Sequence, residues 1–315
     1  MKKLRYHIVD VFTDRQFGGN PLAVFTDGKG LSTETMQAIA KEMNLSETTF
    51  VLPAKDSANH YRVRIFTPGS ELPMAGHPTV GTTFILARES MIETSARTTG
   101  NSEHKSDEDV TTVRLEEGVG TIPVQISWKD AAADFIEMNQ PTPTFDATFD
   151  DRAALAGVIS LEASDIDARF PCQVVSCGVP FLYVPLVGLD AARRARPRLD
   201  LIEKVLSGLP PEIFVFTTET EVSGSSVHSR MFAPGLGITE DPATGAASGP
   251  LGCYLVRHNV VASDSQLDIT SEQGIEMGRP SFIRIRIDRD GEKITRVRVG
   301  GRCCYVGGGH LELED

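Results

Sequence analysis

Glu47, His77 and Asp241 are three ionisable side chains at which an internal repeat of this sequence breaks. The other copy of the repeat has inert residues at the aligned positions, which are Pro211, Ala246 and Leu72. The loops that carry these three groups are expected to meet in one cleft. Ionisable groups that only one copy of the repeat has, and that lie in such a cleft, are candidates for acid/base chemistry. Each residue also has an ordinary interpretation: a solvated or capping glutamate, a plain helix residue, and an aspartate that suits a helix dipole. Three breaks that converge on one cleft favour the catalytic interpretation.

Two segments of small residues predict an anion-binding site beside these groups. Residues 240–249 and 71–81 are each predicted to form a loop that leads into a helix. The first N–H groups of a helix have no intrahelical partner, and the helix dipole places partial positive charge there. Each helix start, at Gly76 and at Gly245, is therefore a candidate site for an anion.

The two segments belong to a repeat that runs through most of the chain. When Gly76 is aligned with Gly245, further matches keep the same order: Gly19 with Gly178, Pro21 with Pro180, Phe50 with Phe214, Arg64 with Arg230, Glu71 with Glu240, Pro73 with Pro242, Arg88 with Arg257, Glu117 with Gln273, and Gly118 with Gly274. The spacing of roughly 160 residues indicates one ancestral unit that was duplicated. Two related lobes would then each aim a helix N-terminus at a shared cleft.

Four motifs, in this order, resemble the phenazine-biosynthesis PhzF-like family. They are Phe-Gly-Gly-Asn-Pro at 17–21, Leu-Ser-Glu at 45–47, Ala-Gly-His-Pro-Thr-Val-Gly at 75–81 and Glu-Asp-Pro-Ala-Thr-Gly at 240–245. The resemblance covers essentially the whole chain. It implies a diaminopimelate-epimerase-like α+β fold with two similar lobes, each a curved, mostly antiparallel sheet around a central helix. It also implies a homodimer.

The resemblance further implies a set of catalytic roles. In an isomerase of that family, the glutamate at the position of Glu47 moves a proton between carbons of a cyclohexadiene carboxylate. The residues that match His77 and Asp241 hold and polarise the substrate. No cofactor or metal is used, so none is expected here.

Small residues are implied to bind the substrate carboxylate. They match Gly76 and Gly245, with the serine that matches Ser46 nearby. Many members of the family have a serine where this chain has Ala246, so a hydroxyl is missing beside the anion site. This departure leaves the identity of the substrate open, and Ser248 is the candidate replacement.

A single acid/base group favours isomerisation over racemisation. Related epimerases invert a carbon with two groups on opposite faces, usually two cysteines, whereas the motif loops here contain none and Cys253 matches Phe84, a core position. One base, Glu47, can remove a proton and return it to the same face at another carbon, with its pKa raised by burial against neighbours such as Phe50. A racemase or dehydratase of a small acid, and a catalytically silent carboxylate-binding protein, are the alternative hypotheses.

Composition restricts the expected partners and location. The chain has 315 residues and a net charge of −12, which argues against nucleic acid or an anionic membrane as partner. No apolar run approaches the length of a membrane span and no signal peptide is recognised, so a cytoplasmic enzyme of small molecules is expected. The seven histidines lack HxH and HExxH spacing, and the five cysteines lack paired metal spacing, so no metal site and reduced thiols are predicted.

Short strands and one long helix per lobe must position these groups. The expected N-terminal lobe comprises residues 1–129 and 301–315 and carries Glu47. The C-terminal lobe comprises 130–300 and carries the Asp-Pro-Ala-Thr-Gly loop. The tail 301–313 alternates like a strand and is predicted to pair within the first lobe. Residues 94–109 have no apolar period and predict a mobile surface loop.

Overall fold

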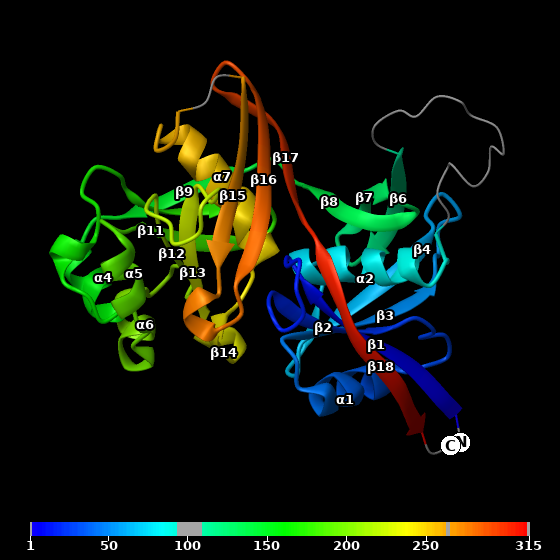
Figure 1. Cartoon of the computed structure of the whole chain (residues 1–315). Helices are drawn as coiled ribbons and strands as arrows, with labels where there is room; N and C mark the ends of the chain where they lie inside the picture. Colours follow the sequence, from blue (N-terminus) through cyan, green and yellow to red (C-terminus); the bar gives the residue numbers. More distant parts are fainter. Residues whose placement is uncertain (1, 93–108, 263–264, 314–315) are drawn as a thin grey trace. The chain divides into compact units, whose positions relative to one another are not determined.

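The computed structural model describes residues 2–92, 109–262 and 265–313 and divides into two compact units (Figure 1). The first unit comprises Met1–Asn139 and Gly300–Asp315, and the second comprises Gln140–Val299. The first boundary lies later than the expected 129/130 because β8 (Ala132–Gln140) is paired with β7 (Gly120–Lys129) of the first unit. The segment predicted as a mobile loop lies, except for residue 109, outside the described residues.

The first unit is a mostly antiparallel sheet with two helices in its described part. Its other elements are β1 (Lys2–Val11), β2 (Asn20–Phe25), α1 (Thr33–Met43), β3 (Glu47–Pro53), β4 (Tyr61–Phe66), β5 (Glu71–Leu72), α2 (Gly76–Arg88), β6 (Asp109–Glu117) and β18 (Cys303–Leu313). Strand β2 pairs antiparallel with β1 and parallel with β3, and β4 pairs antiparallel with β3 and β5 and parallel with β6.

The second unit repeats these pairings strand for strand. Its elements are β9 (Thr144–Phe149), α4 (Arg152–Val158), η1 (Ala163–Asp165), β10 (Cys172–Ser176), β11 (Pro180–Pro185), α5 (Leu189–Arg194), α6 (Leu199–Val205), β12 (Ile213–Thr217), β13 (Val227–Ala233), η2 (Pro234–Leu236), β14 (Ile238–Asp241), α7 (Gly245–Arg257), β15 (Gln266–Gln273), η3 (Ile275–Met277), β16 (Ser281–Asp290) and β17 (Lys293–Gly301). Strands β10 to β15 have the pairing and directions of β1 to β6. The duplication and the two-lobed α+β fold predicted from the sequence are therefore confirmed.

One helix in each unit is buried along almost its whole length. Helix α2 packs against β1, β2 and β3, and α7 packs against β10, β11, β15 and β16. Glycines allow this close approach. A Cβ on Gly81 would lie 2.6 Å from a methyl group of Val11, and one on Gly252 would lie 2.5 Å from a methyl group of Ile285. These are the predicted central helices, and each begins at the predicted glycine.

Shorter helices cover the outer face of each sheet. Helix α1 is capped by the Ser32 hydroxyl, which accepts from the Thr35 N–H at 3.1 Å, and its Met36 and Ile39 pack into the aromatic core of the first unit. In the second unit α4, α5 and α6 share this role through an aliphatic core.

An arginine–glutamate pair holds the strand before each central helix. Arg64 donates through two nitrogens to Glu71 at 2.7 and 2.6 Å. At the repeated positions Arg230 donates to Glu240 at 2.8 Å from both nitrogens. The repeat therefore kept this pair as part of the fold.

The C-terminal tail returns to the first unit. Strand β18 runs antiparallel to β1 from Lys2↔Leu313 to Val11↔Cys303, with an irregularity between Ile8 and Val9. The start of β1 and the end of β18 lie side by side in Figure 1. The predicted pairing of the tail within the first lobe is confirmed, and β9 takes the corresponding place beside β10 in the second unit.

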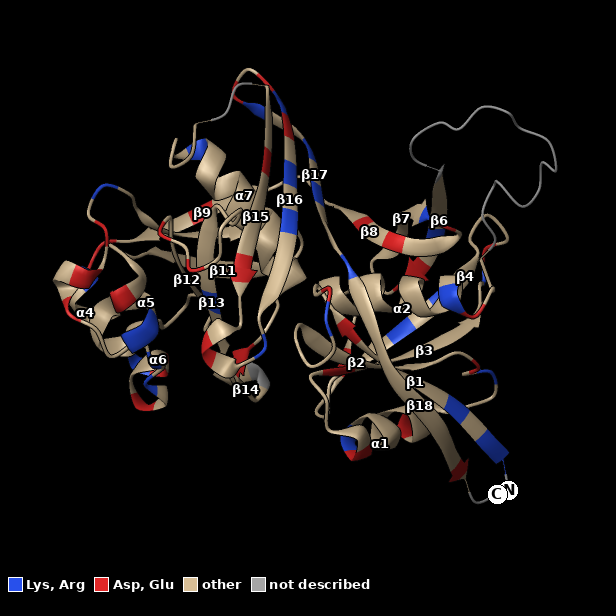
Figure 2. Cartoon of the chain, viewed as in Figure 1, with Lys and Arg blue, Asp and Glu red and all other residues tan. Residues whose placement is uncertain are grey.

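Charged residues lie on strands, on turns and on the shorter helices α1, α4, α5 and α6 (Figure 2), whereas the central helices carry charge only at their C-terminal ends. Among the described residues, no helix has both the length and the apolar character needed to span a membrane.

Deletion of residues 303–315 should destabilise the first unit. It removes one of the two strands paired with β1 and exposes a long strand edge, so aggregation is also expected. Hydrogen exchange followed by mass spectrometry measures the effect, with a chain that lacks only residues 314–315 as the control. Loss of protection confined to residues 140–299 would contradict the prediction.

Candidate active site

Glu47 and His77 form a buried pair in the first unit. Glu47 begins β3, and His77 is the second residue of α2. The two residues are 8% and 4% exposed, and Glu47 Oε2 lies 3.1 Å from His77 Nε2. The Nε2–H bond is not aligned with that oxygen, so the contact is electrostatic rather than a closed hydrogen bond.

Asn20 fixes the protonation of this histidine. The Asn20 Nδ2 group lies 3.2 Å from His77 Nδ1, and because an amide nitrogen only donates, Nδ1 accepts. Burial lowers the pKa of His77 from 6.5 to about 3, so the ring is neutral and its single proton is on Nε2, facing Glu47. Asn20 was not predicted as a site residue, although it belongs to the Phe-Gly-Gly-Asn-Pro motif and begins β2, the parallel neighbour of β3.

Asp241 is held in the second unit by a chain of hydrogen bonds. The Gln273 amide donates to Thr244 Oγ1 at 3.0 Å and to the Asp241 carbonyl oxygen at 2.8 Å. The Thr244 hydroxyl donates to Asp241 Oδ2 at 2.5 Å. Asp241 is 4% exposed, so this chain orients a buried carboxylate at the end of β14. Gln273 entered the sequence analysis only as a repeat match, because its partners lie far away in the chain.

The two predicted helix starts retain the features of anion sites. Gly76 and Gly245 begin α2 and α7 and are buried. Neither helix has a side-chain cap on its first N–H groups or an acidic residue in its first turn, within the described residues. Those donors suit an anionic ligand. Ser46, directly before Glu47, and Ala246 are both half-buried.

Ser248 does not replace the hydroxyl that is missing at Ala246. Its side chain is buried and donates back to the Thr244 carbonyl oxygen at 2.9 Å. This i to i−4 bond turns the hydroxyl toward the helix backbone.

The cysteines have weakly nucleophilic environments. Burial raises the pKa of Cys172 to about 11 and also raises the pKa values of Cys303 and Cys304. The pKa of Cys253 is raised by its contact with the Cys177 thiol and by burial. Cys253 is fully buried, as its predicted core position requires.

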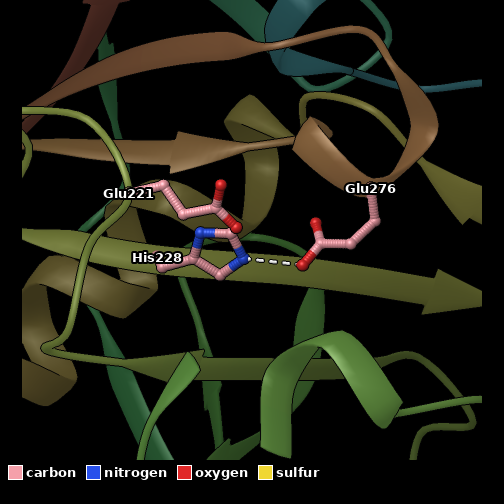
Figure 3. A group of neighbouring side chains, drawn as sticks. All are labelled: Glu221, His228 and Glu276. Carbon is pink, nitrogen blue, oxygen red and sulfur yellow. Dashed lines mark hydrogen bonds and ion pairs between the residues drawn. The ribbon is translucent and has the colours of Figure 1, made fainter. Parts of the chain in front are cut away.

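One group of side chains in the second unit could hold a metal ion: Glu221, His228 and Glu276 (Figure 3), whose ligand atoms lie within 4.8 Å of one another. These atoms already have protein partners. His228 contacts Glu272 through Nδ1 and Glu276 through Nε2, both at 2.9 Å, and Arg193 pairs with Glu221. Burial lowers the pKa of His228, but the two glutamates together outweigh it and raise the pKa. An imidazolium therefore accounts for this arrangement without a metal, and sequence spacing could not have found it.

Comparison with known proteins places this chain in a family. The family model described as phenazine biosynthesis-like protein matches residues 9–309. An uncharacterized isomerase of Mesorhizobium japonicum is 36% identical, with 99% of each chain covered. The trans-2,3-dihydro-3-hydroxyanthranilate isomerase of Pseudomonas aeruginosa is also 36% identical, over 94% of this chain and 95% of its own.

Solved structures agree with this assignment. The phenazine biosynthesis protein of the PhzF family from Bacillus anthracis has a TM-score of 0.87 and 30% identity, covering 99% of this chain and all of its own. A hydroxyproline epimerase from Agrobacterium vitis shares the fold, with a TM-score of 0.62 at 14% identity over 99% of this chain and 91% of its own.

Alkylation of the thiols should leave activity largely intact. Thiolates are the reactive form, and the raised pKa values of Cys172, Cys253 and Cys303 keep these thiols protonated near neutral pH. Turnover before and after iodoacetamide treatment, with labelled sites mapped by mass spectrometry, tests this. Inactivation that follows the labelling of one cysteine stoichiometrically would restore the thiol-racemase hypothesis.

His77 should make the protein less stable in acid. Its pKa is about 3 in the folded chain and 6.5 as the ordinary value, so between these values the unfolded chain binds the extra proton. The free energy of unfolding should therefore fall, through this residue, by about 1.4 kcal/mol for each pH unit below 6.5. Urea unfolding at several pH values should show a shallower fall for His77→Gln. The same substitution at the exposed His310 is the control, and identical slopes for wild type and His77→Gln would refute the assignment.

Proposed function

The chain belongs to the phenazine biosynthesis-like family, and we propose that it is a cofactor-independent isomerase that moves a proton between carbons of a small, cyclic, unsaturated carboxylic acid. The observation that carries this proposal is the buried contact between Glu47 and a neutral His77. A buried carboxylate beside a neutral imidazole can act as a general base. The isomerase names of the relatives support the reaction class.

In the proposed reaction Glu47 is the only acid/base group. Its carboxylate takes a proton from one carbon, the electron pair of that C–H bond shifts the double bond, and the new carboxylic acid returns the proton to another carbon. No oxidant, reductant or cofactor is needed for this balance. The return step requires a protonated Glu47, and burial of a carboxyl group favours that form.

His77 and Asp241 are proposed to hold and polarise the substrate. The neutral His77 ring has one N–H donor on Nε2, which can bind a substrate oxygen or steady the Glu47 carboxylate. Asp241 is kept as an oriented acceptor by Thr244, so it suits an amino or hydroxyl group of the substrate.

The helix starts at Gly76 and Gly245, with Ser46 nearby, are proposed to bind the substrate carboxylate. Ala246 offers no hydroxyl, and Ser248 is turned toward its own helix. The substrate of this chain should therefore make one hydrogen bond fewer beside Ala246 than the substrates of relatives that have a serine at that position.

Racemisation is the main competing reaction. It needs a second acid/base group on the opposite face, and the raised pKa values of the cysteines argue against the usual thiol pair. A dehydratase of a small acid or a silent carboxylate-binding protein would use the same residues for binding.

Incubation of the protein with unsaturated and hydroxylated cyclic acids in deuterated water separates these functions. An isomerase gives a product of unchanged composition with a shifted double bond. Exchange of an α-proton with the double bond left in place would indicate a racemase. Loss of water would indicate a dehydratase, and binding without reaction would indicate a silent binding protein.

The substitution Glu47→Gln should abolish proton transfer while the fold is kept. A positioned acid/base group contributes roughly 10²–10⁴-fold to the rate, so a loss of at least this size is expected. Turnover measures it, and circular dichroism and substrate binding show whether the variant is intact. The exposed Glu42, changed to Gln, is the matched control. Normal turnover by Glu47→Gln would remove Glu47 from the mechanism.

A further inference from the structure

Glu117 is a buried carboxyl group to which the proposed reaction gives no role. It is the last residue of β6 and is 6% exposed. Its Oε1 lies 2.6 Å from the hydroxyl of Thr79, in the first turn of α2. Its Oε2 is buried and has no hydrogen-bond partner among the described residues. An ionised carboxylate in this place would leave an oxygen without compensation, which is unfavourable.

The hydroxyl of Thr79 has two acceptors in reach but only one proton. Besides its contact with Glu117, it lies 2.7 Å from the Ala75 carbonyl oxygen, which can only accept. A hydroxyl has one proton, so the proton that Thr79 gives to Ala75 cannot also go to Glu117. Ser248, at the repeated position in α7, donates to the Thr244 carbonyl oxygen in the same way. A Glu117 that is a neutral carboxylic acid can donate to the Thr79 oxygen and leave the Thr79 proton for Ala75, so both contacts are then satisfied.

The internal repeat places an amide where the first unit has this acid. Strand pairing sets Arg62 opposite Glu116 and His228 opposite Glu272, so the next residues, Glu117 and Gln273, are structural equivalents. Gln273 donates to the hydroxyl of Thr244 beside its own central helix. A glutamine offers one donor group and one acceptor, as a protonated glutamate does.

The following glycines support the equivalence. A Cβ on Gly118 would lie 2.7 Å from Pro73, and one on Gly274 would lie 2.5 Å from Pro242. In both units, therefore, the end of this strand presses on the proline of the loop that leads to the central helix.

We propose that Glu117 is a positioning residue that works as a neutral carboxylic acid and fixes the start of α2 through Thr79. This inference rests on the proposed function, in which that helix start binds the substrate carboxylate. Loss of the proton would break the contact to Thr79 and place a buried negative charge beside an anion site. Substrate binding should then weaken while the chemistry at Glu47 continues.

The electrostatics of the site agree with this role. Burial raises the pKa of Glu117 to about 8, without a contribution from a charged group. The neighbouring Glu116 is engaged elsewhere, because it accepts from the Lys55 N–H at 2.8 Å and lies 3.8 Å from Arg62. On α2, His77 is neutral.

The substitution Glu117→Gln tests whether Glu117 works as a neutral carboxylic acid or is only a buried side chain. Through Glu117, the folding equilibrium of the wild type should weaken about tenfold per pH unit between pH 6.5 and 8, because the unfolded chain releases this proton near 4.5 and His77 no longer titrates in that range. Glu117→Gln should lack this fall, and the exposed Glu42→Gln should retain it. Urea unfolding needs no substrate, so this readout stands even if Glu47 proves not to be the base.

The second readout is the pH profile of KM. KM of wild type should rise above pH 8 with kcat unchanged, and KM of Glu117→Gln should stay flat because its donor cannot ionise. Glu117→Ala should raise KM at every pH, which tests whether the donor is needed. If the stabilities of wild type and Glu117→Gln change with pH in parallel, the claim that Glu117 is a neutral acid is wrong. If Glu117→Gln has a raised KM at neutral pH, the claim that Glu117 is a positioning residue is wrong.

Discussion

The burial of one helix in each sheet is the constraint on which the rest of this structure depends. A buried helix needs small residues where it meets the sheet, as at Gly81 and Gly252, and its first N–H groups need partners that its own backbone cannot supply. The loop before each helix must approach a strand end closely, as the contacts of Gly118 and Gly274 with prolines show. The fold therefore creates a fixed, electropositive helix start in each unit.

The duplication shows which contacts serve the fold and which serve chemistry. Both units keep the strand pairing, the central helix and the arginine–glutamate pair before it. The units differ at Glu47, His77 and Asp241, where only one copy has an ionisable group. Since the shared contacts already hold the backbone, these positions were able to diverge without loss of the fold.

Buried ionisable side chains of the same type differ in protonation state in this structure. His77 loses its charge because burial outweighs its contact with Glu47. His228, equally buried, is held between Glu272 and Glu276, and its pKa rises. Glu117 has no charged partner, so burial favours its neutral form. Burial alone thus does not set the state of a group; its hydrogen-bond partners decide it.

The sequence alone determined the repeat, the two-lobed fold, both central helices with their starts at Gly76 and Gly245, and the return of the tail to the first lobe. These follow from local patterns and from the alignment of the two halves. Only the tertiary structure decided that Asn20 sets the tautomer of His77, that Gln273 holds the Asp241 loop, and that Ser248 is turned away from the site. The physical reason is that a hydrogen bond between distant residues, and the protonation that depends on it, leave no periodic trace in the sequence.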